Sequence, residues 1–407
     1  MTIDRAVFTL ICILLFGLSG SFSILKGAPS YAFGTVLSLL IFSVFIFAYK
    51  SFGILTVKSK VIYIYLLFAV FILIQYVGSS LIYSTGDVPR FLVSMFLLFM
   101  LLLYSSFFVN YCSYLNAEDF NKGLHAVYWI ITLVAIAYIL LTKFGSLGLT
   151  KMLFVREPSH FTLLYAPFLG YVALFSRKRY AHLFLGLVIS LVIMNLTMIV
   201  GVLLCALLLS KVSLLRLFYI IPIACLVVGG VIFIDESGYI LSRLVFGEDT
   251  TNLSTIVFLS GWERAYLSFF DSLGVGVGFQ QMGINGPQGA FMQVLENTYQ
   301  NKLNLLDGGT LGAKLITETG LFGILVLLAY LGMCKGYYRE IQSKGESIRH
   351  KRAFFIVVFV TSLLQFFIRG VGYFSPFGYL FICSLYFLLT DDGEPIKKIA
   401  AKKFGNI

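Results

Sequence analysis

The sequence predicts an all-α polytopic membrane protein, because apolar residues dominate it and charged residues are scarce. Of its 407 residues, 59% are apolar and 12% are charged, whereas soluble domains carry roughly 25% charged residues. The mean hydropathy of +0.93 leaves too little polar surface to cover a soluble core. A soluble enzyme, a nucleic-acid-binding domain and a disordered chain are therefore excluded. With roughly 20 apolar residues per span, the chain has room for about a dozen helices.

Twelve apolar runs are the candidate transmembrane helices. The seventh and eighth share residues 181–210, a stretch that is too long for one helix and rather short for two. Asn195 and Thr197 lie in its middle and favour a short hairpin with a polar turn. One long, tilted helix with a break is the alternative, and it would invert the topology of all later spans. The runs lie near 6–25, 31–49, 61–83, 91–112, 125–142, 159–176, 181–193, 196–210, 215–234, 311–334, 353–372 and 374–390.

The distribution of basic residues favours the hairpin. Cytoplasmic loops of membrane proteins carry an excess of Lys and Arg. With twelve spans and a cytoplasmic N-terminus, most of the 30 basic residues fall in inside segments, above all in 335–352 and in the C-terminal tail. Both termini are therefore expected in the cytoplasm. The net charge of +11 is then a signal of topology and does not imply a nucleic-acid partner.

The spans and loops divide the chain into four parts. Residues 1–234 hold spans one to nine, with an outside loop over 143–160. Residues 235–310 form a much longer outside loop, 311–390 hold spans ten to twelve, and 391–407 form a cytoplasmic tail. Long connections in compact proteins are usually functional or disordered.

The long outside loop is expected to carry two amphipathic helices that lie on the membrane face. Trp262, Tyr266 and Phe270 recur at helical spacing in the first. Between the two helices lies the glycine-rich stretch Gly274–Gly289, where the backbone can approach a ligand or another helix closely. The second helix is predicted from the spacing of Phe291, Val294/Leu295, Tyr299, Leu303 and Leu306.

Polar residues gather where the sixth span begins. Arg156, Glu157, Ser159 and His160 surround Pro158, which is preorganised for the first turn of a helix. The group is either the polar start of a helix or a site at a helix N-terminus that suits an anion. His160 would act as a general base near neutral pH or cap the helix.

Three further cations lie in the outside half of the membrane. Arg264 has the planar fork that suits a phosphate, or it forms an ion pair with a neighbouring acidic residue. Lys314 and Glu318 lie one helical turn apart, as a pair that closes the helix bundle or as a functional group within the membrane. Arg369 ends the eleventh span and either reaches lipid phosphate or lines the same cavity.

These groups suffice for a pyrophosphate clamp and one base. All six cysteines lie in apolar runs, where small buried residues are expected. The chain has no metal-ligand spacing, so we expect neither a metal nor a cofactor. The charged and titratable candidates are Arg156, Arg264, Lys314 and Arg369 together with Glu157, His160, Asp307 and Glu318.

Three stretches carry a resemblance to a known family: Arg156–Phe161, Arg264 followed by Gly274–Phe279, and Thr317–Gly323. The chain resembles the bacterial O-antigen polymerase (Wzy-type) family, within the O-antigen ligase/polymerase superfamily. The related ligases carry a histidine in the large outside loop, and this loop has none. The resemblance implies a GT-C-like architecture.

The family activity implied by this resemblance is a glycosyltransferase reaction at the periplasmic face of the bacterial inner membrane. In this reaction, oligosaccharide repeat units that are carried on undecaprenyl pyrophosphate are joined to one another. The protein would contact membrane lipid, and a chain-length regulator (Wzz-type) is a possible partner. Glu157, His160 and Asp307 are then the candidate bases. Pyrophosphate would contact Arg156, Arg264, Lys314, Glu318 and Arg369. Asn297, Tyr299 and Asn301 would line a sugar groove, or they form the wet face of an interfacial helix.

Two other functions stay open. An O-antigen ligase, or another lipid-linked glycosyltransferase, would use the same donor, but the loop lacks the ligase histidine. A flippase or transporter of lipid-linked oligosaccharides would suit twelve spans. Transporters place their ionisable groups near the bilayer midplane, whereas here such groups crowd the outside half and only Glu318 lies deeper.

Overall fold

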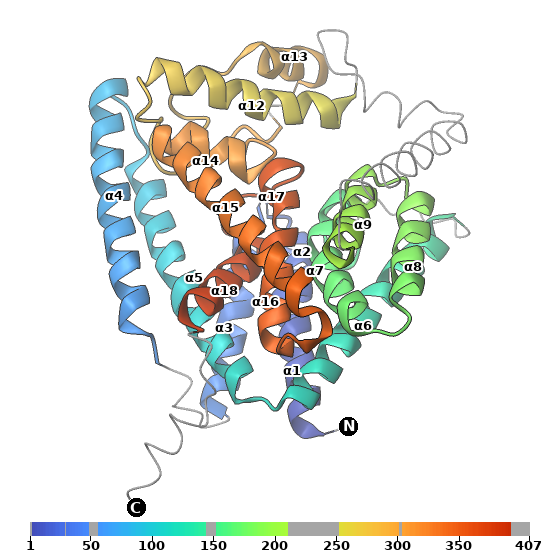
Figure 1. Ribbon diagram of the computed structural model, residues 1–407. Coiled ribbons are helices and arrows are strands. Elements are labelled where there is room, and N and C mark those ends of the chain that lie inside the picture. Colours follow the sequence, from blue (N-terminus) through green and yellow to red (C-terminus); the bar gives the residue numbers. More distant parts are fainter. Residues whose placement is uncertain are drawn as a thin grey trace, which may run out of the picture.

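The computed structural model describes residues 2–28, 30–48, 56–143, 152–210, 252–300 and 303–391. All regular elements within these ranges are helices (Figure 1). Six of these helices are long and apolar enough to cross a membrane, and four shorter helices are also apolar. The chain is therefore an all-α, multi-pass membrane protein. The ninth predicted span and most of the predicted tail lie outside the described residues, so twelve spans and a GT-C-like architecture stay predictions.

The first candidate transmembrane helix contains a π-helical turn. It consists of α1 (Ile3–Cys12), η1 (Ile13–Leu18) and α2 (Ser19–Leu25). α3 (Ala32–Ala48) packs against it. The two helices can touch because Gly34 faces α2, where a Cβ atom would lie 1.8 Å from a backbone carbonyl oxygen.

α7 (Pro158–Phe175) forms the centre of the bundle. Every residue from His160 to Leu174 is buried, as expected of a helix that is apolar on all sides. α6 (Ala117–Lys143) packs beside it. α4 (Ser59–Tyr83) and α5 (Val88–Tyr114) stand at one side of the molecule (Figure 1).

The predicted hairpin over 181–210 is confirmed. α8 (Arg179–Val192) and α9 (Leu196–Leu209) pack against each other. The turn contains Asn195, whose side chain accepts the backbone N–H of Met198 and caps α9. Each helix has 14 residues. It is therefore about 21 Å long, shorter than the hydrocarbon core of about 30 Å.

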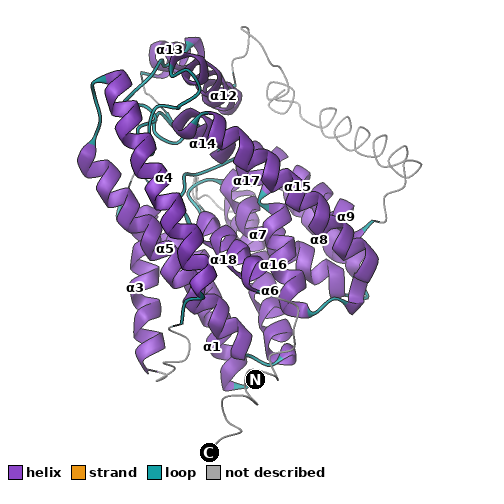
Figure 2. Ribbon diagram, turned by 60° about the vertical axis from the view of Figure 1, so that its left-hand side comes forward, coloured by secondary structure: helices purple, strands orange, loops and turns teal. Residues whose placement is uncertain are grey.

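α12 (Leu253–Asp271) and α13 (Ala290–Tyr299) lie across one end of the bundle (Figures 1 and 2). α12 packs on α14 (Leu311–Thr319). The prediction of one continuous helix over 311–334 is wrong. The chain breaks at Gly320, which has a φ of 57°, and α15 (Leu321–Lys344) begins after it.

Three further helices follow α15 in the described residues. After the short 3₁₀ turn η3 (Gly345–Ser347), α16 (His350–Thr361) packs on α7, and α18 (Pro376–Thr390) packs on α5 and α16. Between them, α17 (Leu363–Phe367) contacts α14. The segment between α17 and α18 is thereby brought against the start of α14, where Gly370 donates its N–H to the Gly309 carbonyl at 2.7 Å.

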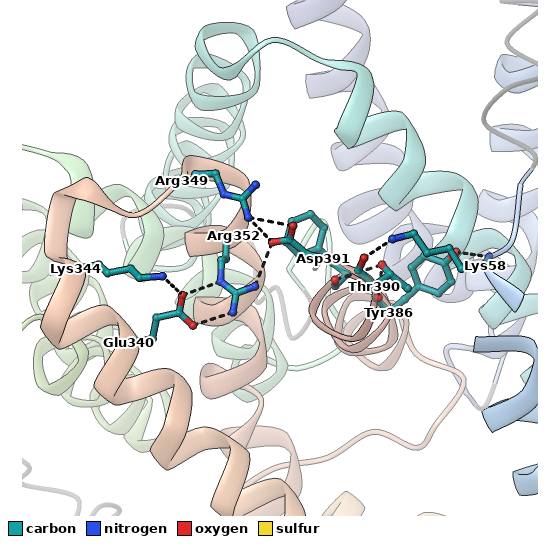
Figure 3. A network of polar contacts seen from close by, with 9 residues as sticks. Lys58, Glu340, Lys344, Arg349, Arg352, Tyr386, Thr390 and Asp391 are labelled. Atoms are coloured by element: carbon teal, nitrogen blue, oxygen red, sulfur yellow. Dashed lines mark hydrogen bonds and ion pairs between the residues drawn. The ribbon is translucent and has the colours of Figure 1, made fainter. Parts of the chain in front are cut away.

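A charged network holds the other end of the bundle together (Figure 3). Arg352 of α16 donates Nε and Nη2 to the two carboxylate oxygens of Glu340 in α15, at 2.7 and 2.9 Å, and Nη1 to Asp391 at 3.1 Å. Lys58, just before α4, donates to the last carbonyl of α18. The start of α1 lies at this same end (Figure 1), opposite α12 and α13.

α12 and α13 each have a buried and an exposed face, as predicted for amphipathic helices. On α12 the aromatic residues Tyr266 and Phe270 are exposed, and the opposite face with Val257 and Ala265 is buried. α13 ends at Tyr299, so the last two leucines of the predicted stripe lie beyond it.

Candidate functional site

Close packing on α2 positions the polar segment before α7. A Cβ atom on Gly20 would lie 1.8 Å from the Phe154 carbonyl oxygen, so only glycine permits this approach. Ser21 donates its hydroxyl to the preceding carbonyl of the same segment. The backbone that carries Arg156 and Glu157 is therefore held against α2.

Glu157 is the N-cap residue of α7, but its side chain does not cap the helix. Its Oε2 instead contacts Arg369 Nη2, Ser159 Oγ at 3.3 Å and His160 Nε2 at 3.8 Å. The Glu157 side chain is 50% exposed and that of Arg369 is 12% exposed. Burial raises the pKa of Glu157. The positive charge of Arg369 and the hydrogen bonds to the carboxylate lower it by more than burial raises it, so the pKa lies below the usual value. Glu157 is thus ionised at neutral pH and accessible.

His160 lies behind Glu157 and is buried. Its Nδ1 is 3.1 Å from the hydroxyl oxygen of Tyr31, and the two rings meet edge to face at 5.7 Å. The same hydroxyl accepts the backbone N–H of Arg156 at 2.8 Å. The side chain of Arg156 is half-buried and near enough to act electrostatically on Tyr31 and His160.

The segment Arg369–Tyr373 connects this group with a second charged cluster. Gly372 has a φ of 81° and packs on Asp307, such that a Cβ atom would lie 2.7 Å from Asp307 Oδ1. The three peptide units between the Cα atoms of Arg369 and Gly372 span at most about 11 Å. Glu157 and Asp307, the latter 33% exposed, therefore flank the same short segment.

The second cluster is centred on Lys314 and is buried. Lys314 Nζ lies 3.1 Å from Glu318 Oε1 and 3.5 Å from Asp307 Oδ1, and it also donates to the Leu306 carbonyl. The side chains of Lys314 and Glu318 are 0% exposed. Lys314 Nζ lies 5.3 Å from the ring centre of Tyr373. The two candidates thus form a buried pair, one of the alternatives left open by their spacing.

The glycine-rich stretch closes over this pair. Its N–H groups cap the last turn of α14, because Gly278 donates to the Glu318 carbonyl at 3.1 Å and the preceding residue donates to the carbonyl before it at 2.9 Å. A Cβ atom on Gly276 would lie 2.5 Å from the Glu318 carbonyl oxygen. Gln75 of α4 donates to the same carbonyl and accepts the Phe279 N–H at 3.1 Å. The glycines therefore serve contact with a helix, the second of the two predicted uses.

Arg264 is 1% exposed on the inner face of α12. Its Nη1 donates to the Leu305 carbonyl at 2.6 Å, the neighbour of the carbonyl that Lys314 holds. Burial lowers the pKa of Arg264 to about 10. Glu263 instead caps α13, accepting the N–H groups of its first two residues at 2.8 and 2.9 Å. Arg264 therefore holds the loop around Asp307, and no ion pair with Glu263 forms.

The candidates divide into an accessible and a buried group. Glu157, Asp307 and the half-buried arginines Arg156 and Arg369 border the surface, whereas His160, Arg264, Lys314 and Glu318 are buried. Asn297 and Tyr299 are exposed on α13, as the wet face of a surface helix would be, and Asn301 lies outside the described residues. The accessible group is hereafter called the rim.

Four residues of the site carry no sequence signal of their own. Tyr31, Gln75 and Tyr373 lie in apolar runs or beside them, where a single polar residue is common. Gln280 adopts a φ of 61°, which is unusual for a residue with a side chain, and its backbone lies against the Glu318 carboxylate. They belong to the site because they contact its charged residues or the backbone around them, and their partners lie far away in the sequence.

No protein-family model matches the chain, and no curated protein matches it either. The chemistry of the site therefore rests on its residues. The rim offers an ionised carboxylate and two arginines at the start of a helix, beside a membrane domain. This combination can bind an anionic group and accept a proton from a neighbouring hydroxyl.

Proposed function

We propose that the protein is a membrane glycosyltransferase that joins oligosaccharide repeat units carried on undecaprenyl pyrophosphate. It would act as a polymerase of O-antigen or a related surface polysaccharide at the periplasmic face of the bacterial inner membrane. The end with α12 and α13 would face the periplasm, and the end with the Arg352 network would face the cytoplasm. The basic residues at the latter end support this orientation.

One observation carries the proposal: the contact between Arg369 and the accessible carboxylate of Glu157. Arg369 Nε is buried and has no hydrogen-bond partner among the described residues, so a phosphate would reach this donor only if the Arg369 side chain moved away from Glu157. The charges of Arg156 and Arg369 both act on His160. A diphosphate is an acceptor that suits the planar fork of arginine.

The reaction needs a cation at the leaving group and a base at the acceptor. A hydroxyl of the acceptor sugar attacks the anomeric carbon of the donor, and the bond from that carbon to the pyrophosphate oxygen breaks through an oxocarbenium-like transition state. Arg369 and Arg156 stabilise the charge that grows on the departing pyrophosphate. Glu157 takes the acceptor proton. When Arg369 binds the donor, Glu157 loses its ion pair and becomes a stronger base.

The buried cluster plays a different part in this scheme. Lys314 and Arg264 hold two consecutive carbonyls of the loop that carries Asp307, and Glu318 balances their charge. These residues position the loop and do not touch the pyrophosphate. Asp307 is the second candidate base because it is accessible and flanks the same segment as Glu157. The exposed face of α13 with Asn297 and Tyr299 is the candidate sugar surface.

A deletion strain tests the function. Its surface polysaccharide is compared on a gel after rescue with wild type, Arg369→Ala or the control Arg349→Ala, which removes an exposed arginine at the opposite end. We expect the deletion strain to show only core bearing one repeat unit, with rescue by wild type and by the control but not by Arg369→Ala. A bare core would contradict the proposal. Long glycan left on the carrier lipid would then indicate a ligase, and single units stranded on the inner leaflet would indicate a flippase.

A further inference from the structure

A chain of three side chains leads from the rim into the protein. Glu157 Oε2 lies 3.8 Å from His160 Nε2, and His160 Nδ1 lies 3.1 Å from the Tyr31 hydroxyl oxygen. The Tyr31 hydroxyl and the His160 ring are buried. Tyr31 is fixed in turn by the backbone N–H of Arg156, at 2.8 Å.

The direction of each hydrogen bond follows from the number of protons available. The backbone N–H of Arg156 can only donate, so the Tyr31 oxygen accepts it. A buried hydroxyl also needs an acceptor for its own proton. Among the described residues, His160 Nδ1 is the acceptor within hydrogen-bond distance of that hydroxyl. Nδ1 therefore carries a lone pair, and in a neutral imidazole the proton then lies on Nε2.

We infer that Tyr31 and His160 are positioning residues for Glu157, with His160 held as the neutral tautomer protonated on Nε2. The protonated Nε2 then lies on the side of Glu157, 3.8 Å from Oε2, which is close enough for electrostatic attraction but too far for a hydrogen bond. The role of Glu157 as the base rests on the proposed function, but the tautomer does not. A histidine in this state has no free lone pair toward the rim, so it cannot take the acceptor proton.

The contacts also select one carboxylate oxygen. Arg369, Ser159 and His160 all approach Oε2 of Glu157. The side chain is half exposed, so Oε1 is the oxygen that meets the acceptor hydroxyl. The charged and titratable groups that face His160 are Glu157, Arg156, Arg369 and Tyr31. Burial of the ring is the main reason that it stays neutral, and the two arginines act in the same direction, against the attraction of Glu157 for a second proton.

Nitrogen NMR tests the tautomer without any assay of activity. The full-length protein is labelled with ¹⁵N-histidine and placed in lipid nanodiscs, and the signals of His160 are assigned by their loss in His160→Asn. We expect an unprotonated Nδ1 and a protonated Nε2 at neutral pH, and a mixture of tautomers in Tyr31→Phe. A protonated Nδ1 in wild type would overturn the inference. Tyr165→Phe is the control, because it removes a buried hydroxyl from α7 that contacts Tyr128 instead.

Substitutions of His160 separate positioning from base catalysis. The amide nitrogen of Gln reaches the place of Nε2, whereas that of Asn reaches the place of Nδ1. We expect His160→Gln to keep kcat within about tenfold of wild type. We expect His160→Asn and Tyr31→Phe to lower kcat by at least about tenfold, with KM within about twofold. If His160→Gln is as inactive as Glu157→Gln, His160 is the base and the inference is wrong.

The two experiments also separate this inference from the proposed function. If wild type joins no repeat units but NMR finds the predicted tautomer, the glycosyltransferase proposal fails and the Tyr31–His160 arrangement stands. If wild type is active and NMR finds a protonated Nδ1, the arrangement is wrong and the function stands.

Discussion

Removal of Lys314 should destabilise the fold, because it would leave Glu318 as a buried carboxylate without its ion-pair partner. Both side chains are 0% exposed and their charged atoms lie 3.1 Å apart. Breaking such a buried pair from one side costs about 3–5 kcal/mol. We expect Lys314→Met to lower the free energy of unfolding by about 3 kcal/mol, the lower end of this range, because the charge of Arg264 still acts on Glu318.

The matching substitution should relieve most of this cost. Glu318→Gln keeps the shape of the side chain and removes the charge, and Lys314 then retains Asp307 at 3.5 Å. The double variant Lys314→Met/Glu318→Gln should therefore be at least about 1 kcal/mol more stable than Lys314→Met alone. Lys344→Met is the control, since its pair with Glu340 has the same spacing but an exposed lysine and should cost less than about 1 kcal/mol.

The free energies can be measured by equilibrium unfolding with SDS in mixed micelles. Trp262 provides a fluorescence signal near the pair, because its ring reaches Gly312 in α14 and stacks on Phe367. The reasoning is refuted if Lys314→Met costs the same with and without Glu318→Gln. A loss of activity in Lys314→Met at unchanged stability would instead indicate that Lys314 binds the substrate directly.

Three further predictions concern the rim, the helix break and the cap of α13. Arg369→Met removes the charge that lowers the pKa of Glu157, so the acid limb of the residual kcat/KM profile should move to higher pH. Gly320→Ala should reduce the yield of folded protein, because φ is 57° and the new Cβ would lie 1.9 Å from a carbonyl oxygen of the glycine-rich stretch. The control Gly332→Ala, with open space around it, should not reduce the yield. Glu263→Ala should destabilise α13 locally by about 0.5–2 kcal/mol, seen as faster hydrogen exchange of its first two amides.

Much of the fold could be predicted from local sequence. Runs of apolar residues located the long helices, and two polar residues, Asn195 and Thr197, located the turn between α8 and α9. Asn195 works as a signal because its side chain caps the following helix. The break at Gly320 was missed because the residues on both sides are apolar enough to continue one span, and the partner that permits the break lies in the glycine-rich stretch.

The direction of the helix faces could not be predicted in the same way. In a soluble protein an aromatic stripe indicates the core, but lipid and protein interior are both apolar, so a stripe on a membrane protein can face either. Tyr266 and Phe270 accordingly face outward on α12, and Arg264 faces inward.

The charged residues of the candidate site could be predicted from the sequence, but the uncharged residues that position them could not. Glu157 and Arg369 were both expected in the outside half, and the structure brings them into contact. Tyr31, which contacts His160, is 129 positions away from it in the sequence and lies at the start of an apolar run. Its position depends on two glycines: Gly34 lets α3 approach α2, and Gly20 lets the segment before α7 approach α2.

The most direct test of the account uses the purified protein and its own substrate. Lipid-linked oligosaccharide that accumulates in the deletion strain is extracted and mixed into proteoliposomes with wild type or Glu157→Gln, and the products are followed by mass spectrometry. We expect glycans of two or more repeat units and released undecaprenyl pyrophosphate with wild type, and a rate lower by a factor of about 10²–10⁴ with Glu157→Gln. No lengthened glycan with wild type, or full activity with Glu157→Gln, would contradict it.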